Sequence, residues 1–206
     1  MSSFAISSRH CWSLAIAPSS TRSIFVRSLT NELLNAAGLF QQAAELAGQD
    51  PLITLRARFG LGRTVLVGVE NQLPGWNQAD AENHFTAIVT AYNKEHSPLL
   101  AWPAASAHAY LGRLAGTMGE WKTMASECRA GIDILEDLPD QETARPWIAI
   151  YLSWAAYADQ RSNNSETAGQ TYRRAIELGQ QAGIDPEKLQ SWQSELDQLE
   201  KGTPPK

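Results

Sequence analysis

The stretch Ser106–Ile134, SAHAYLGRLAGTMGEWKTMASECRAGIDI, decides the fold, because it holds two amphipathic helical patterns with almost no sequence between them. In its first half, Leu111, Leu114 and Met118 recur at three- and four-residue steps, which places them on one face of a helix. Gly119 then breaks the pattern, since glycine is unfavourable inside a helix and readily adopts a positive φ. A second periodic run follows at once. Two amphipathic helices joined so tightly are expected to fold back antiparallel and share their apolar faces.

Small residues accompany both helical patterns. Ala105, Gly112 and Gly116 lie in the first pattern, so we expect another helix to approach it closely. The second pattern has apolar residues at helical spacing, namely Trp121, Met124, Ala125, Cys128, Ile132 and Leu135. The stretch therefore predicts one tightly packed helical hairpin, from about Ala104 to Glu136.

This hairpin resembles the tetratricopeptide repeat, a family of stacked helical hairpins that recur about every 34 residues. Leu111–Gly112 matches a pair in the first helix of that repeat. Gly119–Trp121, a glycine, an acid and an aromatic residue, matches its turn, and Gly131–Ile132 matches a small-plus-apolar pair near its end. Met124 and Cys128 depart from the family, which prefers alanine and an aromatic residue at these positions. The resemblance implies a stack of such hairpins.

Weaker copies of the pattern flank the central hairpin. Leu61–Gly62 gives a second leucine-glycine pair, in a predicted hairpin Leu52–Asn93 with a loop at Asn71–Trp76. A third hairpin is predicted at Ala144–Gln181, with its turn at Asn163–Asn164. These segments indicate three hairpins in succession.

The spacing of these copies exceeds the repeat of the family. From Gly62 to Gly112 is 50 residues, and from Gly112 to Ala156 is 44 residues. Since both steps are longer than about 34 residues, we expect insertions between the helices. Asn93–Pro103 is predicted to be one connection and Asp137–Thr143 another.

Further helices are predicted at both ends. From Thr30 the pattern is helical, and it indicates either a degenerate first hairpin or one long helix bent at Gly38. Asp50–Pro51 and Asp185–Glu187 are typical helix starts, with Asp as N-cap and Pro in the first turn. The last helix has one apolar stripe ending at Leu199, which suits a capping helix. The expected fold is all-α, with antiparallel hairpins stacked as a tetratricopeptide-like right-handed superhelix and a C-terminal cap.

The chain divides by composition into three parts. Residues 1–31 contain nine serines, three arginines and no Asp or Glu, which is typical of an organelle transit peptide. Cys11–Ala17 also resembles a short signal-peptide core, although Pro18 disfavours cleavage after it. The alternative is a lead-in to the first repeat, which would leave the protein in the cytoplasm. Residues 32–201 form the predicted repeat domain, and residues 202–206 a disordered tail.

Composition excludes several classes of function. The 206 residues are 43% hydrophobic and 19% charged, as in ordinary globular proteins. A net charge of −5 argues against a nucleic-acid partner, because such binding needs cations that neutralise phosphates. No stretch approaches the ~18 apolar residues of a membrane span. Cys11 and Cys128 form no disulfide framework and no CxxC motif.

The sequence contains no recognisable catalytic or metal-binding motif. Its four histidines show no HExxH, and no GxxxxGK[ST], GxGxxG or GxSxG occurs. An α-helical enzyme would need acids or histidines that converge on inward faces, and the pattern indicates none. We therefore predict a protein that is not an enzyme and has no cofactor or metal.

The resemblance also implies where a partner would bind. In tetratricopeptide arrays the first helix of each hairpin lines a concave groove for an extended peptide or a helix, and the position after the leucine-glycine pair faces it. That position is Arg63, Arg113 and Tyr157 in the three hairpins, and Arg56 and Arg161 lie on similar faces. Arginines in register could bind carboxylates bidentately. The alternative is that these arginines only keep the surface soluble.

These observations predict a scaffold or adaptor that binds a protein or peptide, with an acidic partner as one option. A peptide- or ligand-sensing regulatory domain of a larger system is the alternative function. The lysine-asparagine set of the chaperone-binding family members is absent. Trp102, Trp147 and Trp154 are expected in the core between hairpins rather than as binding platforms.

Overall fold

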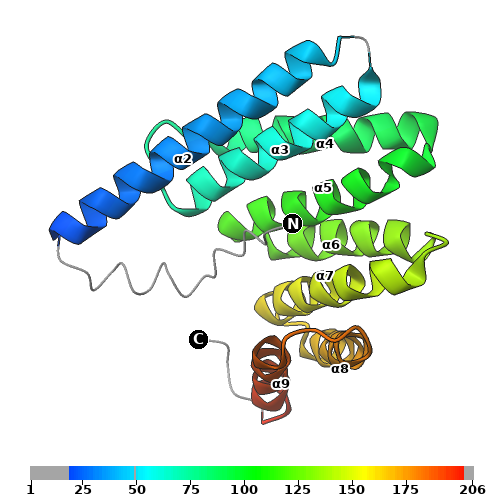
Figure 1. The fold of residues 1–206 in the computed structure, drawn as a ribbon. Coiled ribbons are helices and arrows are strands. Elements are labelled where there is room, and N and C mark those ends of the chain that lie inside the picture. Colours follow the sequence, from blue (N-terminus) through cyan, green and yellow to red (C-terminus); the bar gives the residue numbers. More distant parts are fainter. Residues whose placement is uncertain (1–18, 49, 202–206) are drawn as a thin grey trace.

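The computed structural model describes residues 19–48 and 50–201, with side chains from residue 26 onward. This part of the chain forms eight α-helices and no strand (Figure 1). In chain order the helices are α2 (Ser19–Leu46), α3 (Pro51–Glu70), α4 (Gln78–Glu95), α5 (Pro98–Thr117), α6 (Trp121–Glu136), α7 (Gln141–Arg161), α8 (Ser165–Gln181) and α9 (Pro186–Glu200). The predicted all-α class is confirmed.

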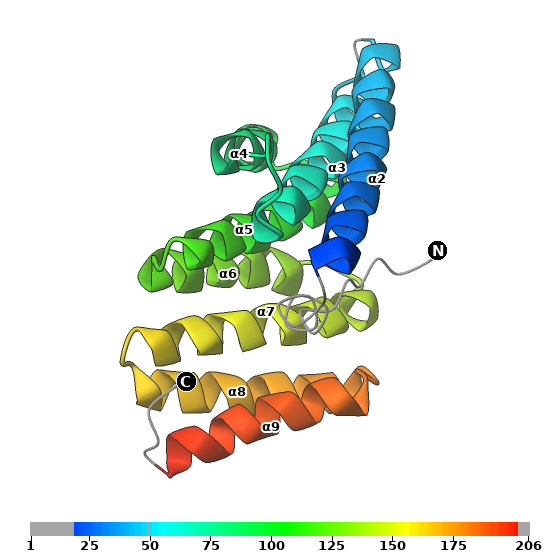
Figure 2. The same cartoon turned by 90° about the vertical axis from the view of Figure 1, so that its left-hand side faces the viewer.

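Each helix packs mainly against the next one in the sequence. In Figure 2, α6, α7 and α8 lie as successive layers, while α2 and α3 stand at a steep angle to them. The one extensive contact between helices that are not consecutive joins, in the described residues, α3 to α5. These are the first helices of neighbouring hairpins, α3–α4 and α5–α6, so the hairpins stack side by side.

The first helices of all three hairpins end in the same hydrogen-bonded closure. In the central hairpin, the N–H of Glu120 donates to the carbonyl of Ala115 at 2.9 Å, and Gly119 adopts φ +78°. This is a Schellman closure, which satisfies the last carbonyls of a helix and needs a left-handed residue. Gln72 has φ 53° and Asn163 has φ 61° at the equivalent places after α3 and α7. The predicted turns at Gly119 and Asn163 are confirmed.

Side-chain caps begin α3 and α9. The Asp50 carboxylate accepts hydrogen bonds from the N–H groups of Leu52 and Ile53 at 2.9 and 3.2 Å. Asp185 accepts one from the N–H of Glu187 at 2.9 Å. Proline follows each aspartate at the start of the helix. Both predicted starts are confirmed, and each such cap stabilises its helix by about 1 kcal/mol.

The predicted insertions are wrong, because the extra residues lengthen the helices instead. The predicted connection Asn93–Pro103 is occupied by the end of α4 and by α5, which begins at Pro98. The predicted connection Asp137–Thr143 ends at Asp140, whose carboxylate caps α7. Prolines caused the error at the first connection: Pro98 stands at the first helical position, where no N–H donor is needed. Pro103 is tolerated inside α5 near its start.

Glycine allows α5 and α6 to approach closely. A Cβ atom added to Gly131 would lie 2.6 Å from the carbonyl oxygen of Ala105 on α5. One added to Gly112 would lie 3.0 Å from the carbonyl oxygen of Met124 on α6. Real Cβ atoms do not come so near to backbone, so a larger residue would push the helices apart. The predicted close approach at Gly112 is confirmed.

The N-terminal helix is one continuous element. α2 runs through Gly38 without a turn, so of the two alternatives the long helix is correct. It also crosses the compositional boundary after residue 31. Leu29 and Leu33, on either side of that boundary, are both buried and pack in one cluster with Leu73. The predicted stripe was too broad, since Leu34 is 56% exposed. Residues 1–18, with the signal-like segment Cys11–Ala17, and residues 202–206 lie outside the described part.

The last helix covers the third hairpin. α9 packs against α8, and its Trp192 and Leu196 are buried in the same cluster as Tyr172 of α8. The expected capping helix is therefore confirmed. None of the helices in residues 19–48 and 50–201 is long and apolar enough to cross a membrane.

Candidate functional site

Three aromatic rings connect the first helices of the three hairpins. Phe59 on α3 and Tyr110 on α5 have their ring centroids 5.8 Å apart. Tyr110 and Trp154 on α7 have theirs 6.5 Å apart. Because each ring comes from a different hairpin, the three rings form a continuous line across the array.

Arginines alternate with these rings. The guanidinium carbon of Arg63 lies 5.9 Å from the centroids of both Phe59 and Tyr110. That of Arg113 lies 5.8 Å from Tyr110 and 5.1 Å from Trp154. Each guanidinium therefore contacts a ring one turn earlier on its own helix and a ring on the next first helix. These are cation–π distances. We call Phe59, Arg63, Tyr110, Arg113 and Trp154 the aromatic–arginine strip.

The third hairpin repeats the unit with one change. Arg161 follows Tyr157 by one turn on α7, and its guanidinium carbon lies 6.0 Å from the Tyr157 ring. Its second ring, at 5.0 Å, is Trp121 of α6. Trp121 and Tyr157 are themselves in edge contact, with centroids 5.8 Å apart. The ring-then-arginine spacing is thus common to α3, α5 and α7.

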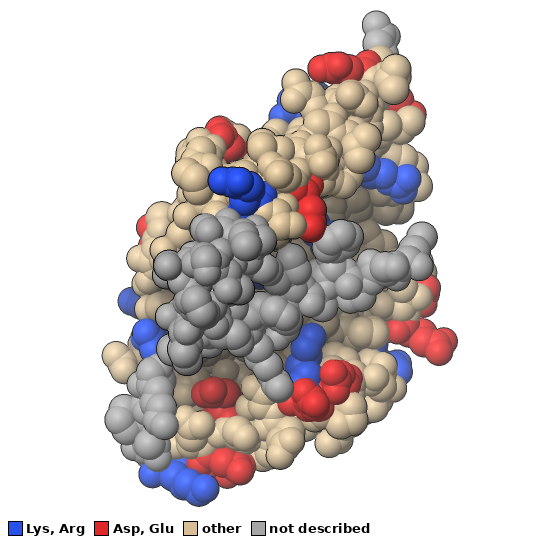
Figure 3. Space-filling view, turned by 60° about the vertical axis from the view of Figure 1, so that its left-hand side comes forward, with Lys and Arg blue, Asp and Glu red and all other residues tan. Residues whose placement is uncertain are grey.

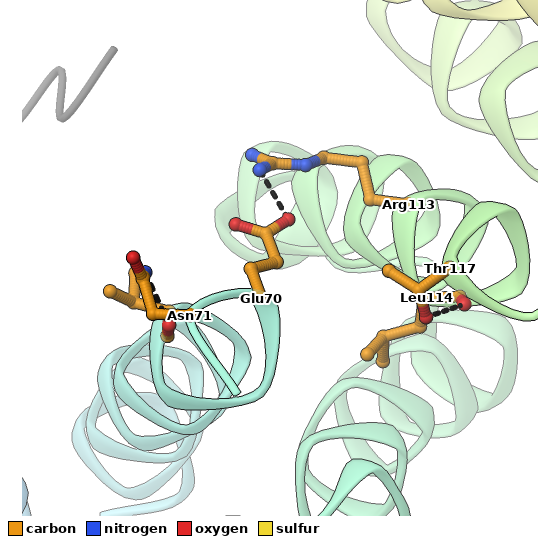
Figure 4. A network of polar contacts seen from close by, with 6 residues as sticks. Glu70, Asn71, Arg113, Leu114 and Thr117 are labelled. Carbon is orange, nitrogen blue, oxygen red and sulfur yellow. Dashed lines mark hydrogen bonds and ion pairs between the residues drawn. The ribbon is translucent and has the colours of Figure 1, made fainter. Parts of the chain in front are cut away.

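Arg113 also forms an ion pair with Glu70, the last residue of α3 (Figure 4). The two side chains point toward each other from neighbouring first helices and are 33% and 25% exposed. Partly exposed pairs of this kind contribute at most about 1 kcal/mol. Glu70 therefore offsets the charge of Arg113 through a contact that another carboxylate could replace.

A hollow opens beside Arg113, between α5, α6 and α7. Its volume is about 290 Å³, its lining is mainly apolar, and it is open to solvent. A Cβ on Gly116 would lie 2.7 Å from the Met124 sulfur, so the glycine leaves this space unfilled. We call the hollow by its seven lining residues, Arg113, Gly116, Thr117, Trp121, Met124, Trp154 and Tyr157.

The structure brings four of the five predicted site residues to this surface. Arg113 and Tyr157 line the hollow, and Arg161 lies over two of its lining rings. Arg63 lies one ring away, across Tyr110. Arg56 is exposed on α3, seven residues before Arg63 and so about two helical turns away, and it lines neither the strip nor the hollow.

Sequence reasoning missed the aromatic half of the site. Trp121 and Met124 were assigned only to the hairpin core, although both also line the hollow. Trp154 contacts the core and lines the hollow as well. Trp147 is 43% exposed, which the expectation of a core position did not foresee. The spacing of a ring and an arginine three or four residues later, present on all three first helices, could have revealed the site.

The titratable groups behind the hollow hold helices together. Asp159 of α7 is buried and pairs with Arg129 of α6. Burial raises the pKa of its carboxyl group, and Arg129 acts against that rise. Burial also raises the pKa of the Cys128 thiol to about 12, so this thiol stays protonated and unreactive near neutral pH. These groups are structural.

The surface offers stacking and positive charge rather than an activated nucleophile. Within the described residues, no three or more His, Cys, Asp and Glu side chains gather to hold a metal ion. On the face in Figure 3, positive and negative side chains are scattered among uncharged ones. Rings and guanidinium groups of this kind recognise anionic and aromatic groups.

No protein-family model matches the chain, and a comparison with curated proteins gives no match. The site is therefore interpreted from its own residues and geometry.

Proposed function

We propose that the protein is a scaffold or adaptor of the tetratricopeptide-like kind, which binds an extended segment of a partner protein along the aromatic–arginine strip. The observation that carries this proposal is the repeated unit of ring, arginine and next ring on α3, α5 and α7. A repeated unit suits a repetitive partner such as an extended chain. Interfaces of this kind are enriched in aromatic residues and arginine.

Charge favours an acidic partner segment. Among the described residues no carboxylate lies within ion-pair distance of Arg63, which is exposed and contacts only rings. Arg113 has Glu70 as its one acidic partner in the described residues. A guanidinium that lies over a ring keeps its N–H donors at its edge, where a carboxylate can bind two of them. The two arginines thus supply two carboxylate sites along one line.

The proposal includes no catalytic step and no cofactor. The groups on the strip are guanidinium groups, which stay protonated in proteins and cannot act as general bases. The proposed place of action is the cytoplasm, with targeting to an organelle through residues 1–31 as the alternative. Imaging a C-terminal fluorescent fusion of the full chain would distinguish them, because a transit peptide would direct the fusion into an organelle.

The proposal is tested by selecting peptides from a random displayed library on the purified full-length chain. Affinity of the selected segments is then measured for the double variant Arg63→Glu/Arg113→Glu. We expect at least a tenfold weakening, because carboxylates would face two new negative charges, with an unchanged circular dichroism spectrum. The weakening on going from wild type to variant should shrink as salt rises, since these contacts are exposed.

A matched control changes the same net charge elsewhere. Arg27→Glu/Lys188→Glu alters two exposed residues on α2 and α9, far from the strip in sequence, and should bind as wild type does. Arg63→Glu alone provides a second variant that breaks no ion pair within the described residues. If both Arg63 variants bind the selected segments as tightly as the control, the strip is not the binding surface.

A further inference from the structure

The hollow beside Arg113 is larger than an extended backbone needs. Its volume of about 290 Å³ lies just below the roughly 300–1,000 Å³ of small-molecule sites. It is also open to solvent along one side. A space of this size suits one large side chain that enters from a segment outside, rather than a cofactor enclosed by the protein.

The walls of the hollow favour an aromatic occupant. Trp121, Trp154 and Tyr157 contribute rings, and Met124 contributes its thioether sulfur. Aromatic rings pack well edge-to-face or offset against other rings, and sulfur contacts ring edges favourably. The absent side chain of Gly116 leaves room beside the Met124 sulfur.

Positive charge flanks the hollow on two sides. Arg113 lines it and lies over Trp154, while Arg161 lies over Trp121 and Tyr157. An aromatic side chain in the hollow would therefore carry its neighbouring backbone past a guanidinium group. A carboxylate at that point would compete with Glu70 for Arg113.

We propose that the hollow binds one aromatic side chain of the partner segment, and that a carboxylate next to this side chain binds Arg113. The carboxylate comes either from a C-terminal aromatic residue itself or from an acidic residue beside an internal one. This inference deepens the proposed function, because it assumes a bound segment and names the group that anchors it.

Nucleobases could also stack on these rings, but the charges oppose them. The chain has a net charge of −5, and Glu70 lies on the guanidinium that a phosphate would need. Nucleic-acid binding depends on neutralising phosphates with cations. A nucleotide is therefore the contrasting probe in the test.

Methionine methyl groups provide a local readout in the full chain. The protein has three methionines, of which Met124 lines the hollow and Met118 is 53% exposed on the same hairpin. Protein labelled with ¹³C at the methionine methyl groups is titrated with N-acetyl-tryptophan, N-acetyl-tryptophan amide, N-acetyl-leucine and adenosine monophosphate. Ring currents from an aromatic occupant shift the Met124 methyl resonance, whereas Met118 reports non-specific effects.

We expect a saturable shift of Met124 alone, with N-acetyl-tryptophan binding several-fold more tightly than its amide and more tightly than N-acetyl-leucine. Tyr157→Ala removes one wall from a residue that is 37% exposed, so it should weaken both tryptophan probes while the fold is kept. Arg113→Gln should remove the difference between the acid and the amide. Peptides ending in a free Trp carboxylate, and amidated peptides with Trp followed by Asp, distinguish the two sources of the carboxylate.

Two results would overturn the inference. One is a Met124 resonance that does not respond to either tryptophan probe, or that moves together with Met118. The other is tighter binding of adenosine monophosphate than of N-acetyl-tryptophan. The proposed function fails separately, through unchanged peptide binding by the Arg63 variants, so a silent hollow with an effective charge reversal rejects the anchor alone.

Discussion

The first and the central hairpins use the same pair of residue types with different results. Near the end of α3, Gly68 lies under the ring of Trp76, which the seven-residue connection Asn71–Asn77 brings back onto the helix. Near the end of α5, Gly116 faces Met124 and the more distant ring of Trp121, which begins α6 after a three-residue connection. A long connection fills the space over its glycine, whereas a short one leaves it open as the hollow.

What covers each hairpin differs in the same way. Trp76 packs in a cluster with Leu29 and Leu33 of α2, so the first hairpin is closed on that side by another helix. In the central hairpin, Trp121 and Tyr157 form the walls of the hollow instead. The comparison teaches that the same glycine-tryptophan pair serves stability in one hairpin and binding in the next.

The largest expected effect tests this comparison directly. Gly68→Ala should lower the free energy of unfolding by about 1–3 kcal/mol, because the new Cβ would clash with the body of the Trp76 ring. Gly116→Ala should be neutral or stabilising by up to ~1 kcal/mol, since only the flexible end of Met124 must move and alanine favours helix. Chemical denaturation of both variants measures the difference. Equal losses at the two sites would contradict the comparison.

The closures of α5 and α3 should respond in opposite directions. Gly119→Val should destabilise the protein by about 1–3 kcal/mol, because a β-branched residue is strained at φ +78°. Gln72→Gly should stabilise it by up to ~1 kcal/mol, because glutamine already occupies φ 53° there. Melting temperatures report both signs. A Gly119→Val protein that melts with wild type would show that the central turn does not need its glycine.

A smaller effect concerns binding by the central hairpin. Glu70→Gln should tighten the binding of acidic segments several-fold, because Arg113 would lose its internal carboxylate and keep its position over Tyr110 and Trp154. Isothermal titration of selected peptides gives the affinities. Glu166→Gln, at an exposed position in the first turn of α8, is the matched control and should change nothing. Weaker binding after Glu70→Gln would mean that Glu70 supports the site rather than competes at it.

Much of this fold follows from local patterns in the sequence. The turn at Gly119 and the caps at Asp50 and Asp185 were predictable, because each depends on neighbours within a few residues. The helix starts at Pro98 and Gln141 were not predicted, since proline is compatible with both a connection and a first helical turn. The all-α class was predictable because amphipathic periodicity extends through most of the chain.

The candidate site was predictable only in part. Arg63, Arg113 and Tyr157 came from their common place after the leucine-glycine pair, and Arg161 from its helix face. Glu70 was missed because α3 runs one turn further past its leucine-glycine pair than α5 does, a difference that only packing reveals: Gly62 is ten residues from Gln72, whereas Gly112 is seven from Gly119. The hollow was missed because a ring in the core and a ring on a wall have the same periodicity.

The central claim is that carboxylates of a partner segment bind the arginines of the aromatic–arginine strip, and a charge swap tests it most directly. The acidic residue of a selected peptide is replaced by lysine, and both peptides are titrated against wild type and Arg63→Glu. The account predicts that the lysine peptide loses at least tenfold in affinity for wild type and regains most of it with Arg63→Glu. Equal affinities of the two peptides for both proteins would contradict it.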